Sequence, residues 1–435
     1  MGKFQKYINT NVLSRVAHLN TTSVLVRIVA GILTSKAIAV LIGVEGMALI
    51  GNLRNFLSAV HATAVLGFYH GLVKFIAEVK EHVKELSKTI STAFYVGYVS
   101  TLLVAFISYY NADFINGFLF SENYNYTYVI KIMAIALPFY SLNLFCFAIM
   151  NGFLKFKMML VINIIGQFLG LGITLFLIYQ SNIDGALVAA VLTPSLLLLM
   201  TFVAILNQRS LISLIKISNV DLTILKKFLP FATMALVSAI AVPTVSIFIR
   251  NYIIEVVGMK EAGYWEAMNR ISDYCLMFIM SLMNLYFLPR FSEIENKREF
   301  RKEVFNFYKS ILPYFAAGLL LVYLLRSLIV RLVFSEAFAP ATELFMWQLL
   351  GDFVKVLSVV IAFQFIAKRM FWHFVIIEVF LVCMMYLTSV YLIDIYGVKG
   401  AVIGHFVSYV LFYGLVLLIF SSSLFGVIQE EVPKE

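Results

Sequence analysis

The most constraining feature of this 435-residue chain is a succession of long apolar segments separated by short polar connections. A helix that crosses the hydrocarbon core of a bilayer needs about 20 apolar residues. Hydrophobic residues make up 62% of the chain and charged residues only 13%, whereas a soluble domain has about 25% charged residues. The composition therefore argues against a soluble enzyme, a disordered chain and a disulfide-stabilised secreted domain. Twelve helical spans are predicted, at residues 21–42, 47–73, 89–110, 127–153, 158–179, 185–207, 229–257, 262–289, 309–333, 344–367, 372–394 and 400–424.

The connections between these spans differ in charge from one side to the other. One set, which includes both chain ends, carries nearly all the Lys and Arg residues outside the spans, and the opposite set carries only Lys260 and Lys399. Basic connections stay in the cytoplasm, so both termini are predicted to be cytoplasmic. The net charge of +9 is therefore explained by membrane orientation, and no nucleic-acid partner is expected.

The two halves of the sequence resemble each other at an offset of about 215 residues. Leu177-Ile178 and Gly185-Ala186 recur as Leu392-Ile393 and Gly400-Ala401. The offset covers six spans, an even number, so both halves enter the membrane in the same orientation. Repeats of this kind are related by an axis along the membrane normal in one class of transporters.

These patterns together predict the fold class. We expect an all-α membrane protein with twelve transmembrane helices in two six-helix lobes, related by a pseudo-two-fold axis along the membrane normal. The N-terminal lobe is assigned to residues 1–215 and the C-terminal lobe to residues 216–435, around a central cavity.

Basic residues inside the predicted spans suggest what the cavity binds. Each would cost about 2.5–3.5 kcal/mol at the centre of a lipid-facing helix, so we expect them to face protein or water. Several have no acidic residue close by in the sequence, and a guanidinium group pairs with two phosphate oxygens at once. A phosphorylated lipid or another anionic solute is the ligand that this chemistry favours. The candidate substrate-binding residues are Arg27, Lys36, Arg54, Arg250, Arg270 and Lys355.

Acidic residues and a histidine lie in the same spans. Glu266, Arg270 and Asp273 are spaced i, i+4, i+7 and therefore share one helix face. Such residues can tune the cations or carry a coupling proton, but they can also form neutral structural pairs, such as Glu266 with Arg270 or Asp352 with Lys355. The candidate ion-coupling or charge-tuning residues are His61, Glu266, Asp273 and Asp352.

Motifs of known catalytic sites are missing from the sequence. It contains no phosphate-binding GxxxxGK[ST] loop, no HExxH metal motif and no GxSxG motif that can be placed between a strand and a helix. The longest connection on the predicted outer side, residues 111–126, has no set of catalytic groups. We therefore expect no catalytic residues, no metal site and no cofactor.

One stretch of the chain is similar to a known family. Gly263-Tyr264-Trp265-Glu266-Ala267, followed by Arg270-Ile271-Ser272-Asp273 and Leu288-Pro289-Arg290-Phe291-Ser292, resembles the Wzx-type O-antigen and lipid III flippases. These belong to the multidrug/oligosaccharidyl-lipid/polysaccharide exporter superfamily. The resemblance implies a flippase of the bacterial inner membrane that moves an undecaprenyl-diphosphate-linked oligosaccharide to the periplasmic leaflet. It also implies alternating access of two lobes, coupled to protons or monovalent ions.

Two alternatives stay open at this point. An ion-coupled exporter of small amphiphiles would share the fold, and a membrane-embedded glycan polymerase or ligase would need a larger periplasmic loop than the sequence offers. The partners expected of a flippase are its lipid-linked oligosaccharide, ions, membrane lipids and the polysaccharide polymerase machinery. A monomer is expected.

Overall fold

The protein is described here by a computed structural model that covers residues 2–79, 81–120, 124–206 and 213–426. Every regular element in these ranges is a helix. The apolar segments predict this, because a helix satisfies its backbone hydrogen bonds within one segment and needs no water to do so. The chain forms two compact units, Met1–Asn251 with Val333–Ala337 and Tyr252–Leu332 with Phe338–Glu435. The predicted lobes, divided between residues 215 and 216, are defined by the sequence repeat and not by contacts. That division stays a prediction.

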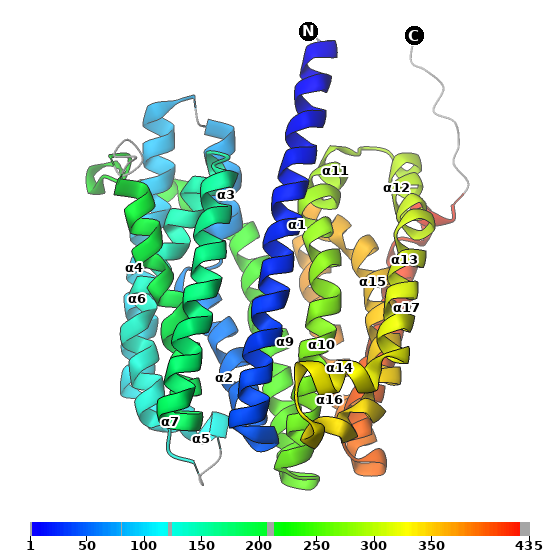
Figure 1. Ribbon diagram of the computed structural model, residues 1–435. Helices are drawn as coiled ribbons and strands as arrows, with labels where there is room; N and C mark the ends of the chain where they lie inside the picture. The colour runs from blue at the N-terminus through cyan, green and yellow to red at the C-terminus, as the bar shows by residue number, and fades with distance from the viewer. Residues whose placement is uncertain (1, 80, 121–123, 207–212, 427–435) are drawn as a thin grey trace. The chain divides into compact units, whose positions relative to one another are not determined.

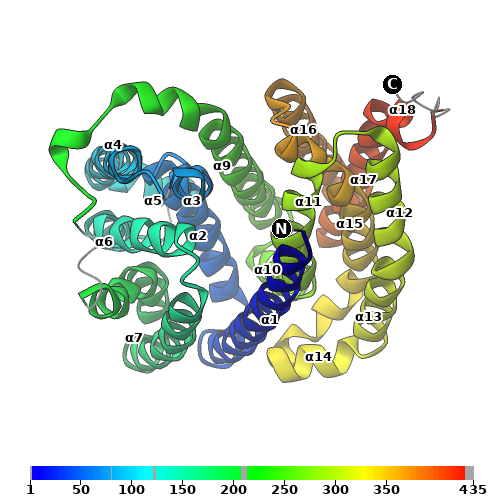
Figure 2. The ribbon, with the colours of Figure 1, turned by 90° about the horizontal axis from the view of Figure 1, so that it is seen from above.

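The first unit is a bundle in which α4, α6 and α7 run side by side (Figures 1 and 2). Leu72 of α3, Ile90 of α4 and Phe228 of α9 are fully buried in one hydrophobic cluster that joins these helices. The helices are α1 (Gly2–Leu41), α2 (Gly43–Ala64), α3 (Phe68–Val79), α4 (Val83–Tyr110), α5 (Ala112–Phe120), α6 (Thr127–Gly152), α7 (Phe156–Leu206), η1 (Ile217–Asn219), η2 (Leu222–Ile224) and most of α9 (Leu225–Val256).

The second unit contains the remaining helices apart from Val333 of α14 and Glu336 and Ala337 of η4, and in it α17 packs against both α15 and α16. The π-helix η3 continues α10 into α11 without a loop. The helices are α10 (Met259–Leu282), η3 (Met283–Phe287), α11 (Leu288–Glu293), α12 (Lys297–Ser310), α13 (Leu312–Leu324), α14 (Arg326–Val333), η4 (Glu336–Leu344), α15 (Phe345–Ala367), α16 (Phe371–Tyr396), α17 (Val398–Ile419) and α18 (Ser421–Leu424).

The twelve predicted spans do not each correspond to one separate helix in the structure. Within the described residues, ten helices are long and apolar enough to cross a membrane. One of them, in α7, contains two predicted spans, because its backbone leaves helical geometry only at Ser181 and Asn182. The predicted span 47–73 is divided between α2 and α3, since Leu66 and Gly67 adopt positive φ angles.

The backbone itself repeats between the two units. Gly43 and Gly258 both have positive φ angles, of 86° and 136°. Leu154 and Arg369 do so as well, with φ angles of 58° and 55°. The two residues of each pair are separated by the same offset of about 215 positions as the sequence repeat. Positive φ is uncommon for a residue with a side chain, so its recurrence at matched positions shows that the repeat is structural.

A third pair marks a tight turn, which lies within α7 in the first unit and between α16 and α17 in the second. Asn182 has φ 48° and ψ −121°, and Gly397 has φ 61° and ψ −145°. Just after each turn a glycine sits against the preceding helix. A Cβ on Gly185 would lie 1.8 Å from the backbone oxygen of Leu177, and one on Gly400 would lie 2.1 Å from that of Leu392. The matched glycines found in the sequence therefore allow the same close helix contact in each unit.

Candidate substrate and ion site

Three of the predicted cations lie on α1 and α2 of the first unit. The side chains of Arg27 and Arg54 are exposed, whereas Lys36 is half-buried. The Nζ atom of Lys36 donates a hydrogen bond to the backbone oxygen of Phe334 over 2.5 Å. Arg27 and Arg54 therefore have the accessibility that a ligand-binding cation needs, and Lys36 is partly engaged within the protein.

Arg250 has a different environment from the other predicted cations. Only 1% of its surface is exposed, and its Nη1 donates to the side-chain oxygen of Asn52 over 2.8 Å. The Asn52 amide in turn donates to the side-chain oxygen of Asn251 and to the backbone oxygen of Leu119, both over 2.7 Å. The network joins α9, α2 and α5, so the structure places Arg250 in the packed interior of the first unit.

His61 of α2 lies against an aromatic ring. Its imidazole stacks on Tyr140 of α6 with a centroid distance of 3.7 Å and an interplanar angle of 15°. The histidine is half-buried.

Glu266 and Arg270 form an ion pair within α10 of the second unit. The Arg270 Nε lies 3.1 Å from Glu266 Oε1, and the two side chains are 1% and 5% exposed. Burial of two charges is tolerated when they are paired in good geometry, and the i, i+4 spacing supplies that geometry. Asp273, on the same predicted face, is exposed instead. The structural-pair interpretation of Glu266 and Arg270 is therefore the one that the geometry supports.

The most deeply buried carboxyl group among the predicted residues is that of Asp352 in α15, which is fully buried. His405 Nε2 of α17 lies 3.2 Å from its Oδ1. Gln348 Nε2, one helical turn before, lies 3.4 Å from the same oxygen and 3.3 Å from Ser272 Oγ of α10. The other carboxyl oxygen, Oδ2, has no hydrogen-bond partner in the described part of the chain. Burial of a carboxyl group with one oxygen lacking a hydrogen bond is energetically costly. Ionisable groups of this kind inside membrane helices are typical of sites that bind an ion or a proton.

The lack of a side chain at Gly351 allows the contact between Asp352 and His405. A Cβ on Gly351 would lie 2.3 Å from Cδ2 of His405, so glycine at this position lets the imidazole approach α15. One turn further, Lys355 Nζ lies 5.3 Å from the centre of the Tyr409 ring, within the range of a cation–π interaction. The carboxyl group of Asp352 contacts His405, and it also acts electrostatically on Lys355.

Sequence reasoning missed His405. The signal was available, because an ionisable residue inside a predicted span is by itself a candidate functional residue, and His405 lies in the predicted span 400–424. No residue spacing links it to Asp352, since the two are 53 positions apart. Groups of three or more His, Cys, Asp or Glu side chains able to hold a metal do not occur within the described residues.

Long apolar helices with buried charged groups define a helical integral membrane protein. A family model described as "Polysaccharide biosynthesis protein" matches residues 22–343. The chain belongs to this family, which confirms the resemblance found at Gly263–Ala267.

Relatives of known function extend over nearly the whole chain. The lipid III flippase of Escherichia coli K12 is 27% identical over 405 residues, which cover 93% of this chain and 97% of that protein. The lipid III flippase of Shigella flexneri matches with the same values. These relatives are transporters.

Solved structures share the fold at lower identity. A multidrug resistance MATE family transporter of the MOP superfamily, in an inward-facing conformation, superposes with a TM-score of 0.72 at 14% identity, covering 92% of this chain and 95% of its own. The lipid II flippase MurJ superposes with a TM-score of 0.67 at 16% identity, covering 93% and 87%. The predicted all-α membrane fold of two lobes is thereby confirmed.

Proposed function

We propose that this protein is a flippase that moves a lipid-linked oligosaccharide, carried on undecaprenyl diphosphate, from the cytoplasmic to the periplasmic leaflet of the bacterial inner membrane. The observation that carries the proposal is the match to a lipid III flippase along 93% of this chain and 97% of that protein. The charged side chains within otherwise apolar helices add to it, because an anionic headgroup needs compensating charge to cross a bilayer.

Arg27 and Arg54 are the residues we assign to the diphosphate. Both are exposed on apolar helices of the first unit, and guanidinium groups bind phosphate oxygens in pairs. Lys36 adds positive charge on the same helix as Arg27. Lys355, in the second unit, is the further candidate. For Arg250 and Arg270 we now propose a supporting role through Asn52 and Glu266 in place of direct contact with the cargo.

Asp352 and His405 are the residues we assign to the coupling proton. A carboxyl–imidazole pair at 3.2 Å can gain or lose one proton, and in a buried site each change alters the local charge strongly.

Lys355 of α15 and Tyr409 of α17 border the pair, and Asp273 of α10 acts electrostatically on Lys355. Glu378 of α16 is buried and acts on Tyr409. Release of the proton on the side opposite its uptake would drive alternating access. Glu266, Asp273 and His61 would tune the charge of the two units.

The orientation and partners of the protein are also proposals. The excess of Lys and Arg in one set of connections supports a cytoplasmic location of both termini. We propose that the protein acts as a monomer and delivers its cargo to polysaccharide polymerase machinery. The connection 111–126, where a polymerase or ligase would need catalytic groups, contains α5 and a structural asparagine. The Asn116 side chain binds the backbone oxygen of Tyr124 and the backbone nitrogen of Tyr126.

The test is complementation of a strain that lacks this gene. The Arg54→Gln variant should abolish surface polysaccharide at normal protein level and leave single lipid-linked repeat units on the inner leaflet. Arg298→Gln, which removes the same charge from an exposed position on α12, should complement fully. Normal surface polysaccharide in the Arg54→Gln strain would refute the assigned binding site. Drug efflux without any effect on polysaccharide would instead favour the exporter of small amphiphiles.

A further inference from the structure

A groove of about 640 Å³ lies between the two arms of α7 in the first unit. Volumes of about 300–1,000 Å³ are typical of small-molecule sites. None of the charged residues assigned above lines the groove. Its walls are hydrophobic, and two lysines make one end basic. None of the proposed transport steps involves these residues. The lining residues are Leu154, Lys155, Phe156, Lys157, Met158, Val161, Ile162, Ile165, Met200, Val203 and Ala204.

The position of the groove follows from how the arms of α7 pack. Nearer the turn at Asn182, glycines bring the arms together. A Cβ on Gly170 would lie 2.5 Å from Thr193 Cγ2, and one on Gly166 would lie 1.9 Å from Leu197 Cδ2. Toward Phe156 no glycine lies between the arms, and the groove begins there.

The floor of the groove is fixed and its rim is open. Ile162 is buried in a cluster with Phe147 and Met150 of α6, and Met200 packs against that cluster. On the rim, Val161 is 46% exposed and Val203 is 63% exposed. An open apolar trough on a membrane helix pair suits a hydrocarbon chain that enters sideways from the bilayer.

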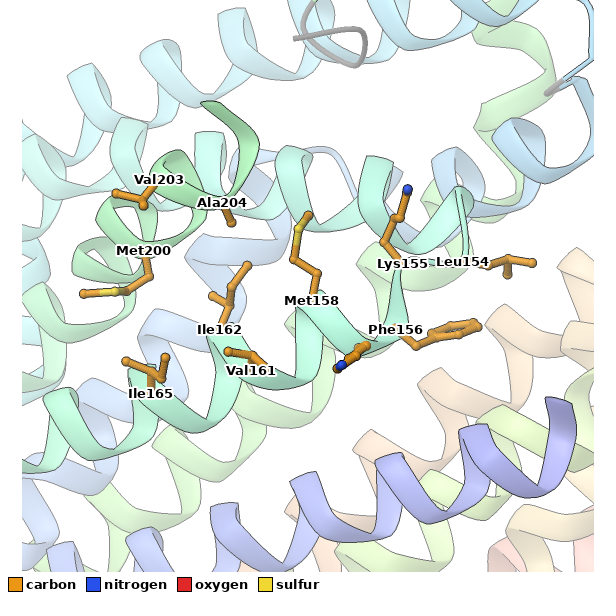
Figure 3. Close-up of a pocket in the computed structure, with 11 residues that line it drawn as sticks. Leu154, Lys155, Phe156, Met158, Val161, Ile162, Ile165, Met200, Val203 and Ala204 are labelled. Carbon is orange, nitrogen blue, oxygen red and sulfur yellow. The ribbon is translucent and has the colours of Figure 1, made fainter. Parts of the chain in front are cut away.

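Lys155 and Lys157 supply charge at one end of this trough. Figure 3 shows Lys155 with Leu154 and Phe156 at the end opposite Ile165 and Met200. Both lysine side chains are exposed, and neither forms an ion pair within the described ranges of the chain. The backbone N–H groups at the start of α7 lie at the same end, where a helix favours negative charge. The arrangement complements an anionic headgroup attached to an apolar chain.

The two lysines of the groove have no basic counterpart at the matched positions of the second unit, although Lys368 and Arg369 directly precede those positions. At the repeat spacing, Met370 and Trp372 occupy the positions of Lys155 and Lys157, and Ile419 occupies the position of Ala204. The second unit thus carries neither lysine and has a larger side chain where the groove has alanine. The exact placement of Lys155 and Lys157 at the groove is therefore not repeated in the second unit.

We propose that this groove is a binding site for an anionic phospholipid of the surrounding leaflet, with one acyl chain between the arms of α7 and the phosphate group at Lys155 and Lys157. The site is separate from the cargo route, and its existence does not depend on the function proposed above. An anionic lipid held there would couple the local lipid composition to the packing of α6 and α7.

Native mass spectrometry of the full-length protein in detergent tests this proposal. The probes are dioleoyl phosphatidylglycerol and dioleoyl phosphatidylcholine, which have the same chains and differ in headgroup charge. We expect tighter binding of phosphatidylglycerol. A surface lysine contributes roughly fivefold to the binding of anionic lipid, so Lys155→Gln with Lys157→Gln should weaken that binding roughly 30-fold. The matched control, Lys84→Gln with Lys302→Gln, removes two exposed lysines outside the groove and should leave it unchanged.

A second variant tests the groove itself. Val203→Trp places a bulky side chain at the open rim, where it should not disturb the fold, and should reduce phosphatidylglycerol binding at least tenfold. Equal binding of the two lipids, or no effect of Val203→Trp, would overturn the proposal, since the lysines would then act only as surface charge. Undecaprenyl diphosphate displacing phosphatidylglycerol at a tenth of its concentration would also overturn it, because the groove would then hold the cargo. Inorganic phosphate should not compete.

Discussion

The Arg250 guanidinium donates to the side-chain oxygen of Asn52 over 2.8 Å, although 198 positions separate the two residues in the sequence. The contact joins α9 to α2, and the Asn52 amide extends it to α5 through the backbone oxygen of Leu119. A buried cation is thus provided with an oxygen acceptor inside the first unit. The sequence suggests Arg250 as a ligand-binding residue, whereas its contacts make it part of the packed interior of the first unit.

Removal of the Asn52 side chain should destabilise the first unit. Hydrogen bonds to a charged group contribute about 1.5–3 kcal/mol, so we expect Asn52→Ala to lower the free energy of unfolding by about that amount. Thermal unfolding of the purified protein in detergent measures it. Asn55→Ala, in the same helix at a half-buried position, is the control and should change stability by less than about 0.5 kcal/mol. Equal melting temperatures of the two variants would contradict the structural role of Arg250.

Loss of the buried carboxyl group should uncouple transport from the proton gradient. Asp352→Asn keeps the size of the side chain but cannot release a proton, and His405→Gln removes the imidazole. In proteoliposomes, both variants should show the same flipping rate with and without an imposed pH difference, whereas the wild type responds to it. Asp113→Asn, at an exposed position of α5, should respond like the wild type. A full response to the gradient in Asp352→Asn would place the coupling proton elsewhere.

The matched glycines should be equally intolerant of a methyl group. Gly185→Ala and Gly400→Ala would each force a Cβ against a backbone oxygen, at 1.8 and 2.1 Å. Overpacking of this kind costs about 1–3 kcal/mol. A Cβ on Gly172 or Gly414 would meet nothing within 4 Å, so their alanine variants should be neutral or more stable by about 0.5–1 kcal/mol. Chemical denaturation of the four variants distinguishes the two groups, and a neutral Gly400→Ala would argue against the shared contact.

Acid should weaken the attachment of the η2 segment to α4. The hydroxyl of Thr223, the ammonium of Lys88 at 3.0 Å and the backbone N–H of Thr223 all donate to the Asp221 carboxyl group and lower its pKa to about 2. A lowered pKa in the folded state stabilises the protein above the unfolded value of about 3.9, and this stabilisation is lost as the pH falls toward 2. Between pH 5 and pH 3, the melting temperature of the wild type should therefore fall further than that of Asp221→Asn. Parallel curves would show that the carboxyl group contributes nothing.

The fold was largely predictable because its main signals are local. Long apolar segments predict helices wherever they occur, and the repeated glycines at Gly185 and Gly400 report a turn geometry that depends on adjacent residues. The number of separate helices was less predictable. Whether α7 is interrupted at Asn182, or α2 and α3 are separated at Gly67, depends on a few backbone angles that hydropathy does not detect.

The amino-acid sequence by itself determined which segments are apolar enough for a membrane, where the two halves repeat, and which charged residues lie among apolar neighbours. Only the tertiary structure decided what each charge contacts. It buried Arg250 against Asn52, left Arg54 exposed, and brought His405 to Asp352. The physical reason is that hydropathy is a property of neighbouring residues along the chain. The partner of a side chain depends instead on the rotation and contact of helices that are distant in sequence, set by small residues such as Gly351.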